Sequence, residues 1–371
     1  YLQSNHLKYL EPKSLSTLTN LKYLTLKFNE LTFLDERTFE FMRNLNKLDL
    51  SENQIREISN QAFRGLNKLK FLNLGGNQIE KLNEDTFYPL ENIRTLKLVS
   101  NKLESLFNIP IGRLQSLREL LLNDRIKDLN INKYTQDCKM RSIGWNFELN
   151  LVNVQSFSND STKVSFGCLN NFNQLTLNFD SSNSWSENAI QLELDGILRL
   201  KELILASSSI GNFREFHLIS NTNITGNIDA LSLSKNQINL IDSVEFKGFR
   251  NLKQLDLSYN SIESIENVEL KGISTLEHLD LRGNKIDLHN RIARFKVVPK
   301  LKHLSLANNP IGNNINNVTF DGIASLEHLD LRKCEIKLIE NDQNRSIRFN
   351  GIPKLKQLIL AENPIEQIDT V

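Results

Sequence analysis

The chain has 371 residues, with 45 Lys and Arg against 44 Asp and Glu, which gives a formal net charge of +1. This balance excludes a global electrostatic bias toward nucleic acid or an anionic membrane surface. No apolar run reaches the roughly 18 residues that a membrane-spanning helix needs, so the sequence contains no candidate span.

One short pattern recurs along the chain, and residues 45–55 carry it most clearly. It reads L-x-x-L-x-L-x-x-N-x-I. Leu48 and Leu50 alternate with polar Lys47 and Asp49, which predicts a strand with leucines toward the core and polar side chains exposed. Length alone would suggest two or three domains, but stacked repeats share one continuous core. We therefore predict a single repeat domain over residues 1–371.

The asparagine that closes each copy of the pattern fixes the spacing of the tiers. In the first part of the chain the step is 24 residues, giving Asn5, Asn29, Asn53, Asn77 and Asn101. Asparagine returns later at Asn236, Asn260, Asn284, Asn309 and Asn363. We assign the equivalent position in the other copies to Arg125, Val154, Asp180, Ser208 and Cys334, for fifteen tiers in all. An inward amide both donates and accepts hydrogen bonds, so these asparagines predict a ladder that satisfies buried turn backbone.

The regularity of the tiers divides the domain into three parts. They are residues 1–124 with regular tiers, 125–230 with irregular tiers and insertions, and 231–371 with regular tiers and a late insertion. Polar loops at 130–145 and 178–198 contain Trp145 and Trp185. Loops that project from a solenoid often bind ligands, but they can also be tolerated insertions without a specific role.

A phenylalanine recurs about ten residues after the tier asparagine. It is found at Phe39, Phe63, Phe87, Phe246, Phe295 and Phe320. We expect it to fill the convex side. The pattern resembles the leucine-rich repeat, and the fold class that this implies is an α/β leucine-rich repeat solenoid, or horseshoe. We expect a parallel concave β-sheet of about 15 tiers and an irregular convex side with short helices. At about 4.8 Å per strand the sheet would be roughly 70 Å long, which suits a macromolecular ligand.

The irregular central tiers point to a more specific family within the proteins that share this repeat. Residues 111–123 (IGRLQSLRELLLN) are followed by a polar loop with Cys138 and then by residues 147–151 (FELNL). This succession resembles Toll-like receptor ectodomains, in which a regular N-terminal block gives way to degraded central tiers before regularity returns. The resemblance implies a pattern-recognition receptor ectodomain that binds microbial or danger-associated molecules, or a cytokine-like ligand, and dimerises to signal. The caps, membrane helix and signalling domain of that family are absent from the sequence, so we expect a fragment.

No catalytic motif is present: the chain lacks G-x-S-x-G, a P-loop, H-E-x-x-H and C-x-x-C. We therefore predict a protein that is not an enzyme and has no cofactor and no metal site. The expected partners are a macromolecular ligand (protein, lipid, glycan or nucleic acid) and a second receptor chain in a homo- or heterodimer. The expected location is the extracellular cell surface or the endosomal lumen, with a membrane link only through the missing anchor. The alternative is a secreted or cell-surface adhesion or matrix protein on the same scaffold.

The cysteines and sequons bear on that location. Cys334 replaces a ladder asparagine, so we expect a buried, inert thiol. Cys138 and Cys168 bracket an irregular tier and either form a disulfide in an extracellular protein or stay free, because spacing alone does not bring two sulfurs together. Four N-x-S/T sequons favour a secretory route. They are Asn159, Asn223, Asn317 and Asn344, all outside the strand cores.

A polar motif repeats in the C-terminal tiers, and its members are our ligand-binding candidates. These are His278, Asp280, Arg282, His303, Ser305, His328, Asp330 and Arg332. Stacked strands should place the three histidines in one column at about 4.8 Å per tier, beside a column that also contains Asp256. Clustered histidines titrate near pH 6, so the column predicts pH-dependent ligand binding or dimerisation. The alternative is that neighbouring repeats share ancestry, while nearby aspartates mute any switch.

Two further sets of residues are candidates for surface contacts. Five basic residues, expected on the return segment after Asn284, could contact phosphates or form a solvated helical face: Arg291, Arg294, Lys296, Lys300 and Lys302. On the exposed strand face of the first tiers, Tyr23, Lys27, Phe28 and Phe71 differ from tier to tier, as expected of a binding surface.

Overall fold

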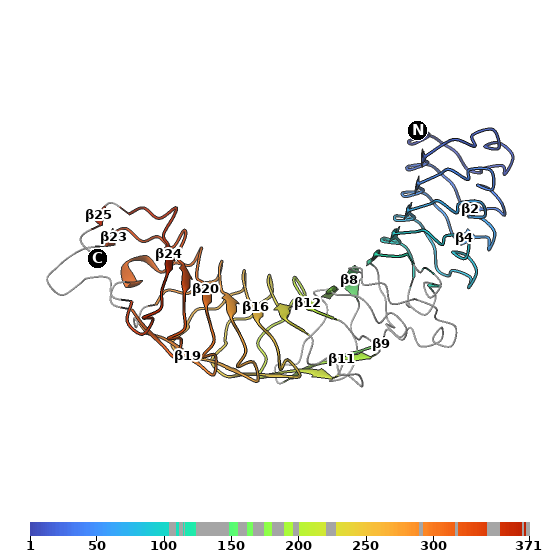
Figure 1. Cartoon of the computed structure of the whole chain (residues 1–371). Helices are drawn as coiled ribbons and strands as arrows, with labels where there is room; N and C mark the ends of the chain where they lie inside the picture. Colours follow the sequence, from blue (N-terminus) through green and yellow to red (C-terminus); the bar gives the residue numbers. More distant parts are fainter. Residues whose placement is uncertain are drawn as a thin grey trace. The chain divides into compact units, whose positions relative to one another are not determined.

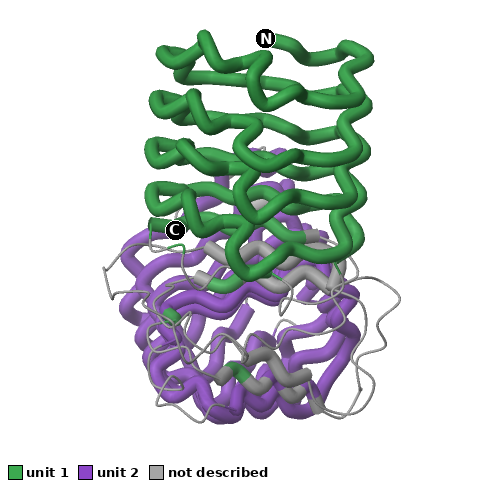
Figure 2. The backbone as a smooth tube through the Cα atoms, turned by 90° about the vertical axis from the view of Figure 1, so that its right-hand side faces the viewer, with its two compact units in different colours: residues 1–157, 163–182, 194–200 green, residues 158–162, 183–193, 201–371 purple. Residues whose placement is uncertain are grey.

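The structure is a computed structural model, and its chain divides into two compact units. Unit 1 comprises residues 1–157, 163–182 and 194–200, and unit 2 comprises residues 158–162, 183–193 and 201–371 (Figure 2). Each unit is described by itself. The residues that the structure describes are 1–103, 109–110, 114, 116–123, 148–154, 162–165, 174–179, 189–195, 200–219, 228–288, 292–315, 318–339, 349–365 and 367–368.

Unit 1 is a stack of coils (Figure 2), and each coil after the first contributes one short strand to a parallel sheet (Figure 1). In the order of pairing, the strands are β1 (Tyr23–Thr25), β3 (Lys47–Asp49), β5 (Phe71–Asn73), β6 (Thr95–Lys97), β7 (Glu119–Asn123), β8 (Glu148–Val154) and β10 (Gln174–Phe179). The first tier has no strand but follows the same path, because Leu2 N donates to Thr25 O at 3.0 Å. A smaller pair, β2 (Phe33–Leu34) and β4 (Glu57–Ile58), lies outside this sheet.

Unit 2 repeats the arrangement with seven parallel strands. They are β12 (Glu202–Ile204), β14 (Ala230–Ser232), β16 (Gln254–Asp256), β18 (His278–Asp280), β20 (His303–Ser305), β22 (His328–Asp330) and β24 (Gln357–Ile359). Together with the strands of unit 1 they account for the second to fifteenth tiers. The predicted solenoid of parallel strands is therefore confirmed.

The opposite side of unit 2 carries a second parallel sheet (Figure 1). Its strands are β11 (Ala189–Asp195), β13 (Glu215–Ile219), β15 (Val244–Lys247), β17 (Val268–Lys271), β19 (Ile292–Lys296) and β21 (Thr319–Asp321). Two other short strands, β23 (Leu338–Ile339) and β25 (Gln367–Ile368), pair with each other, and β9 spans Thr162–Ser165.

The prediction of short helices on the convex side is wrong. In the described parts of the chain the single helix is a 3-10 turn, η5 (Gly312–Ile315). The reason lies in the sequences of β15 and β17, VEFK and VELK, in which buried apolar residues alternate with charged ones. That period of two, with a β-branched residue at the start, favours a strand over a helix.

The core of each unit is filled by leucines from the strands and by the recurrent phenylalanine. Phe39, Phe63 and Phe87 are at most 1% exposed, and their rings stack with centroid separations of 6.3 and 6.1 Å. Phe246, Phe295 and Phe320 are likewise buried, so the predicted role of this residue is confirmed. The backbone passes close by at Gly65, where φ is +89° and a Cβ would lie 2.2 Å from Glu40 O. Only glycine fits such a position without strain.

The asparagine ladder forms as predicted, and Asn53 shows its geometry. Its Nδ2 donates to Leu50 O in its own tier and to Leu26 O in the preceding tier, both at 3.0 Å, while its Oδ1 accepts from Leu31 N at 3.1 Å. One amide therefore joins two tiers and satisfies backbone that would otherwise be buried without a partner. Asn29, Asn77, Asn101, Asn260, Asn284 and Asn309 bond in the same way.

Two ladder positions are occupied by smaller residues, and neighbouring amides compensate. At Ser208, the Oδ1 of Asn236 accepts from Ser208 N at 2.9 Å and from Ile210 N at 3.0 Å. Cys334 is fully buried, as expected, and its Sγ donates to Leu306 O at 3.2 Å. Burial raises the pKa of this thiol to about 11, so it is protonated and unreactive at neutral pH.

Several predictions concern residues outside the described part of the chain. These residues are Trp145, Trp185, Cys138, Cys168, Arg291, Asn159, Asn223, Asn317 and Asn344. Among the described residues, no helix combines the length and the apolar character needed to cross a bilayer.

Candidate ligand-binding face

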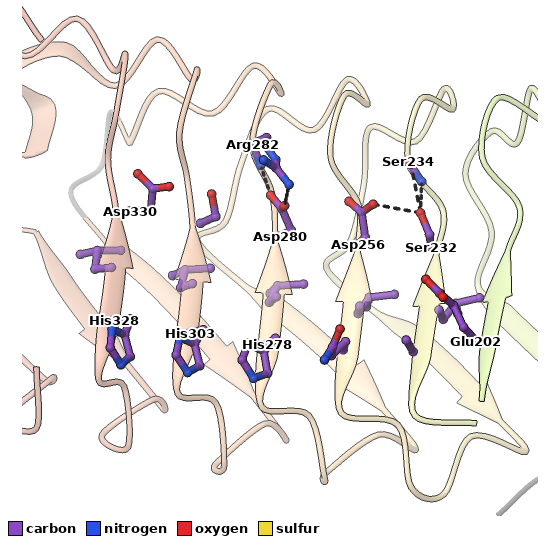
Figure 3. A pocket seen from close by; sticks show the side chains of 18 of the residues that line it. Glu202, Ser232, Ser234, Asp256, His278, Asp280, Arg282, His303, His328 and Asp330 are labelled. Atoms are coloured by element: carbon purple, nitrogen blue, oxygen red, sulfur yellow. Dashed lines mark hydrogen bonds and ion pairs between the residues drawn. The ribbon is translucent and has the colours of Figure 1, made fainter. Parts of the chain in front are cut away.

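The exposed face of the short strands in unit 2, here called the unit 2 face, carries side chains in parallel columns (Figure 3). Each strand turns one leucine inward, such as Leu279 or Leu304, and exposes the residues on either side of it. Because the strands pair without a shift, His278 lies opposite His303, and His303 opposite His328. The groove on this face is lined by residues of all seven strands from β12 to β24.

The histidine column is a stack of imidazole rings. The ring centroids of His278 and His303 are 4.1 Å apart and those of His303 and His328 are 4.2 Å apart, with interplanar angles of 4° and 7°. At the end of the column, His328 Nδ1 forms a hydrogen bond of 2.8 Å with Gln357 Oε1. The predicted alignment of the three histidines is present, with rings closer together than the strands that carry them.

The adjacent column is acidic, and hydrogen bonds within the protein occupy much of it. Its members are Asp256, Asp280, Ser305 and Asp330. Arg282, two residues after the end of β18, pairs with Asp280, and Arg332 Nη2 lies 2.6 Å from Asp330 Oδ2. Burial raises the pKa of Asp280 above its ordinary value, in opposition to the hydrogen bonds from Arg282. The two arginines are therefore largely neutralised by their own carboxylate partners.

A further column of alternating charges borders the histidines, and the sequence-based prediction missed it. Its members are Lys201, Asp229, Lys253, Glu277, Lys302, Glu327 and Lys356. Lys302 Nζ lies 2.9 Å from Glu277 Oε2, and Lys356 Nζ lies 2.9 Å from Glu327 Oε2. The sequence contains a signal for this column, because each of these residues immediately precedes the first residue of a strand. The sign of the charge at that position alternates from tier to tier.

The basic patch expected after Asn284 is not a single surface. Lys302 belongs to the unit 2 face, while Arg294 and Lys296 lie on β19 of the second sheet. The helical face considered for this segment is thus wrong, because alternating burial in residues 292–296 makes it a strand. Arg294 Nε lies 3.9 Å from Asp321 Oδ2, so part of its charge is balanced locally.

The environment of His278 and His303 favours their neutral form. Burial lowers the pKa of His278, the charges of Lys302 and His328 add to this, and Glu277 opposes it. Burial also lowers the pKa of His303, followed by repulsion from His278 and His328. Two imidazolium charges at a ring separation of 4 Å would repel by about 1 kcal/mol in water and about 4 kcal/mol near a protein surface. Protonation of one histidine therefore opposes protonation of the next.

The unit 2 face presents its polar side chains along an open groove. Over the residues described, no group of three or more His, Cys, Asp or Glu is placed to hold a metal ion. Seven of the eight candidate residues line the groove of the unit 2 face, six of them on the paired strands β18, β20 and β22, and the eighth, Arg332, pairs with Asp330. Their role in ligand recognition stays a prediction.

Comparison with known proteins bears on the family. The model of the family described as "Leucine rich repeat" matches residues 1–55, 19–79, 43–103 and 226–286. Similar solved structures include the leucine-rich repeat domain of APL1B, with 18% identity, 90% of this chain and 81% of that chain covered, and a TM-score of 0.46. TLR13 in the TLR13–ssRNA13 complex has 20% identity, with 98% of this chain and 73% of that chain covered and a TM-score of 0.35. The APL1 leucine-rich repeat domain has 18% identity, with 86% of this chain and 73% of that chain covered and a TM-score of 0.41.

No curated protein sequence gives a significant match. The tier pattern, the asparagine ladder and the family matches agree with one another. Leucine-rich repeat solenoids are typically non-catalytic binding domains. The chain has the leucine-rich repeat fold, a solenoid of parallel strands.

Proposed function

We propose that the chain is the ligand-recognition part of a pattern-recognition receptor resembling the Toll-like receptors. It binds a macromolecular ligand non-covalently through the unit 2 face, in the extracellular space or the endosomal lumen. The observation that carries the proposal is the groove itself, which draws side chains from seven successive strands. At about 4.8 Å per strand, this face extends for roughly 29 Å, well beyond the reach of most metabolites.

The chemistry of the face suits a polar ligand with both donors and acceptors. Stacked imidazoles offer ring edges, Ser232 and Ser305 offer hydroxyls, and Asp256 offers a carboxylate that no arginine neutralises in the described structure. Because Lys302 and Lys356 beside the histidines are paired with carboxylates, specificity would come from hydrogen-bond geometry more than from net charge.

The histidine column supports a dependence on pH. Acidification adds positive charge to a surface that is nearly neutral at pH 7, so an anionic or hydrogen-bond-accepting ligand group would gain affinity. Glu277 and Glu327 border the column, and Lys302 and Lys356 hold those carboxylates in ion pairs. The bordering acids are thereby prevented from fully cancelling the new charge.

The receptor assignment is supported by the irregular centre between two regular blocks, which resembles Toll-like receptors. In such a receptor, ligand binding would bring two chains together. The test uses the full glycosylated chain, immobilised and exposed in turn to lipopeptide, lipopolysaccharide, single- and double-stranded RNA, β-glucan and fibrillar collagen. Binding is measured at neutral pH and at about pH 5.5, and sedimentation velocity then reports whether the bound chain dimerises.

The expected result is binding of one microbial class, stronger in acid, with dimer formation. The variant His278→Gln/His303→Gln/His328→Gln should lose the acid enhancement, while His6→Gln/His217→Gln, which changes histidines elsewhere, should keep it. Collagen binding without dimerisation would support an adhesion or matrix protein instead. An unchanged pH dependence in the triple variant would contradict the role of the column.

A further inference from the structure

The exposed face of the short strands in unit 1, here called the unit 1 face, differs from the unit 2 face in its charges. Six cationic residues stand on or beside its strands: Lys22, Lys27, Lys47, Lys70, Arg94 and Lys97. Across the described part of the chain, none of the six forms an ion pair with a carboxylate. From β1 to β7 the acids on this face are fewer, namely Asp49, Glu52 and Glu119. The unit 1 face therefore carries uncompensated positive charge.

Aromatic rings hold three of these cations in place. Lys47 Nζ lies 4.6 Å and Lys97 Nζ lies 5.6 Å from the centroid of Phe71, and Lys27 Nζ lies 4.4 Å from the centroid of Phe28. Cation–π contacts of this kind restrict long, flexible side chains at a solvent-exposed site. Part of the entropy lost when a lysine binds an anion is therefore lost before the ligand arrives.

The strand pairing turns these cations into an ordered array. Tyr23, Lys47, Phe71 and Thr95 occupy one column, since each lies opposite the next in the pairing of β1, β3, β5 and β6. Lys22, Lys70 and Arg94 stand just before the corresponding strands and are exposed. With about 4.8 Å between strands, the array spans roughly 14 Å along the stack. Asn46 stands at the same position before β3, so the cations are spread over several columns, and a flexible ligand with many anionic groups would match them.

We propose that the unit 1 face is a binding site for a linear anionic polysaccharide that bears sulfate or carboxylate groups. A stack of lysines and one arginine supplies the countercharges, and the exposed ring of Tyr23, which is 62% accessible, supplies a flat apolar surface beside them. This inference goes beyond the proposed receptor function and does not depend on it, because it concerns other residues in the other unit.

Two other classes of macromolecule fit the face less well. Single-stranded nucleic acid binds through aromatic rings that are free to stack on bases, but Phe71 and Phe28 are engaged by lysines. Protein interfaces are depleted of lysine at their centres and enriched in apolar and aromatic contacts. Here lysines occupy the centre, while the most exposed rings, Tyr23 and Phe28, lie toward one end.

The test measures binding of the full chain to heparin as the sulfated probe and to hyaluronan as the carboxylate probe. Dextran serves as a neutral polysaccharide, and a single-stranded RNA oligonucleotide serves as a different polyanion. Titrations at several salt concentrations should show that the logarithm of heparin affinity falls linearly with the logarithm of salt concentration. Dextran should not bind, and RNA should bind more weakly than heparin at equal salt.

The variant Lys22→Gln/Lys70→Gln/Arg94→Gln should lower heparin affinity at least about tenfold and reduce the salt slope by roughly two to three. The matched control Lys13→Gln/Lys68→Gln/Lys81→Gln removes the same charge from exposed positions of unit 1 outside the face, and should bind as the wild type does. Lys22→Arg/Lys70→Arg/Arg94→Lys keeps the charges and should retain binding. Phe71→Leu, which removes the ring under Lys47 and Lys97, should weaken binding severalfold.

Three outcomes would overturn the inference. The first is that heparin does not bind at moderate salt. The second is that the variant on the face and the matched control variant lose binding equally. The third is that RNA binds more tightly than heparin and is affected by the same substitutions. The last outcome would assign the face to nucleic acid. Heparin binding at neutral pH should be unaffected by His278→Gln/His303→Gln/His328→Gln, so failure of this proposal and failure of the proposed receptor function can be told apart.

Discussion

The two strand faces have the same backbone and opposite electrostatic organisation. On the unit 2 face, Lys201, Lys302 and Lys356 stand just before the strands and each has an acidic partner in a neighbouring tier. On the unit 1 face, Lys22 and Lys70 occupy the equivalent positions and have no such partner in the described structure. The scaffold determines where columns lie, and the residues at exposed positions decide whether a column is self-neutralised or left for an anionic partner.

The asparagine ladder should support both faces equally, and substitutions in it should cause the largest losses of stability. Asn53→Ala in unit 1 and Asn260→Ala in unit 2 should each lower the free energy of unfolding by about 3 kcal/mol. Each removes an amide that bonds two buried carbonyls and one buried N–H, and unsatisfied buried groups cost about 1–3 kcal/mol each. Thermal and urea unfolding would measure this.

The control for the ladder variants is Gln54→Ala, at an exposed position beside Asn53, which should change stability by less than about 0.5 kcal/mol. If Asn53→Ala and Asn260→Ala differed by more than their errors, the two units would not share one energetic scaffold. A loss as small as that of the control would contradict the role of the ladder.

The second prediction concerns pH, to which the unit 2 face alone should respond through its histidines. The pKa values of His278 and His303 lie below the ordinary value, so the unfolded chain takes up protons at a higher pH than the folded chain. Stability should therefore be complete above about pH 6.5 and decline as pH falls through the folded-state pKa values. Urea titrations between neutral and acidic pH would follow this decline.

The variant His303→Gln tests the origin of that decline. It removes the central ring, and with it the repulsion between adjacent imidazolium groups, so the acid-linked loss of stability should be smaller than in the wild type. His6→Gln, at an exposed histidine of unit 1, should leave the loss unchanged. A wild-type pH profile in His303→Gln would show that other groups, such as carboxylates, cause the acid sensitivity.

Features that repeat with every tier could be predicted from the sequence, and features that depend on the local pattern or on side-chain rotamers could not. The tiers, the ladder, the buried phenylalanines and the alignment of His278, His303 and His328 follow from a strict repeat. The second sheet was missed because the convex segments were judged by their position in the repeat, although VEFK at 244–247 alternates like a strand. The ring separations near 4.1 Å and the lysine contacts with Phe71 depend on side-chain rotamers, which no repeat pattern specifies.

The smallest expected change in stability offers the sharpest comparison of the two faces. Glu277→Gln/Glu327→Gln removes the acidic partners of Lys302 and Lys356 and so gives the unit 2 face the unpaired lysines of the unit 1 face. Because these pairs are partly exposed to solvent, stability should fall by less than about 1 kcal/mol. Heparin affinity should nevertheless rise, and the rise should survive when Lys22→Gln/Lys70→Gln/Arg94→Gln is combined with the change.

The matched control for this change is Glu80→Gln/Glu84→Gln, which adds the same net charge at exposed positions away from both faces. It should leave heparin affinity near the wild-type value, since a polyanion responds to arrayed cations more than to net charge. Equal gains from the two pairs of substitutions would mean that net charge alone governs binding. In that case the pairing of lysines with acids on the unit 2 face would have no part in deciding which face attracts an anionic ligand.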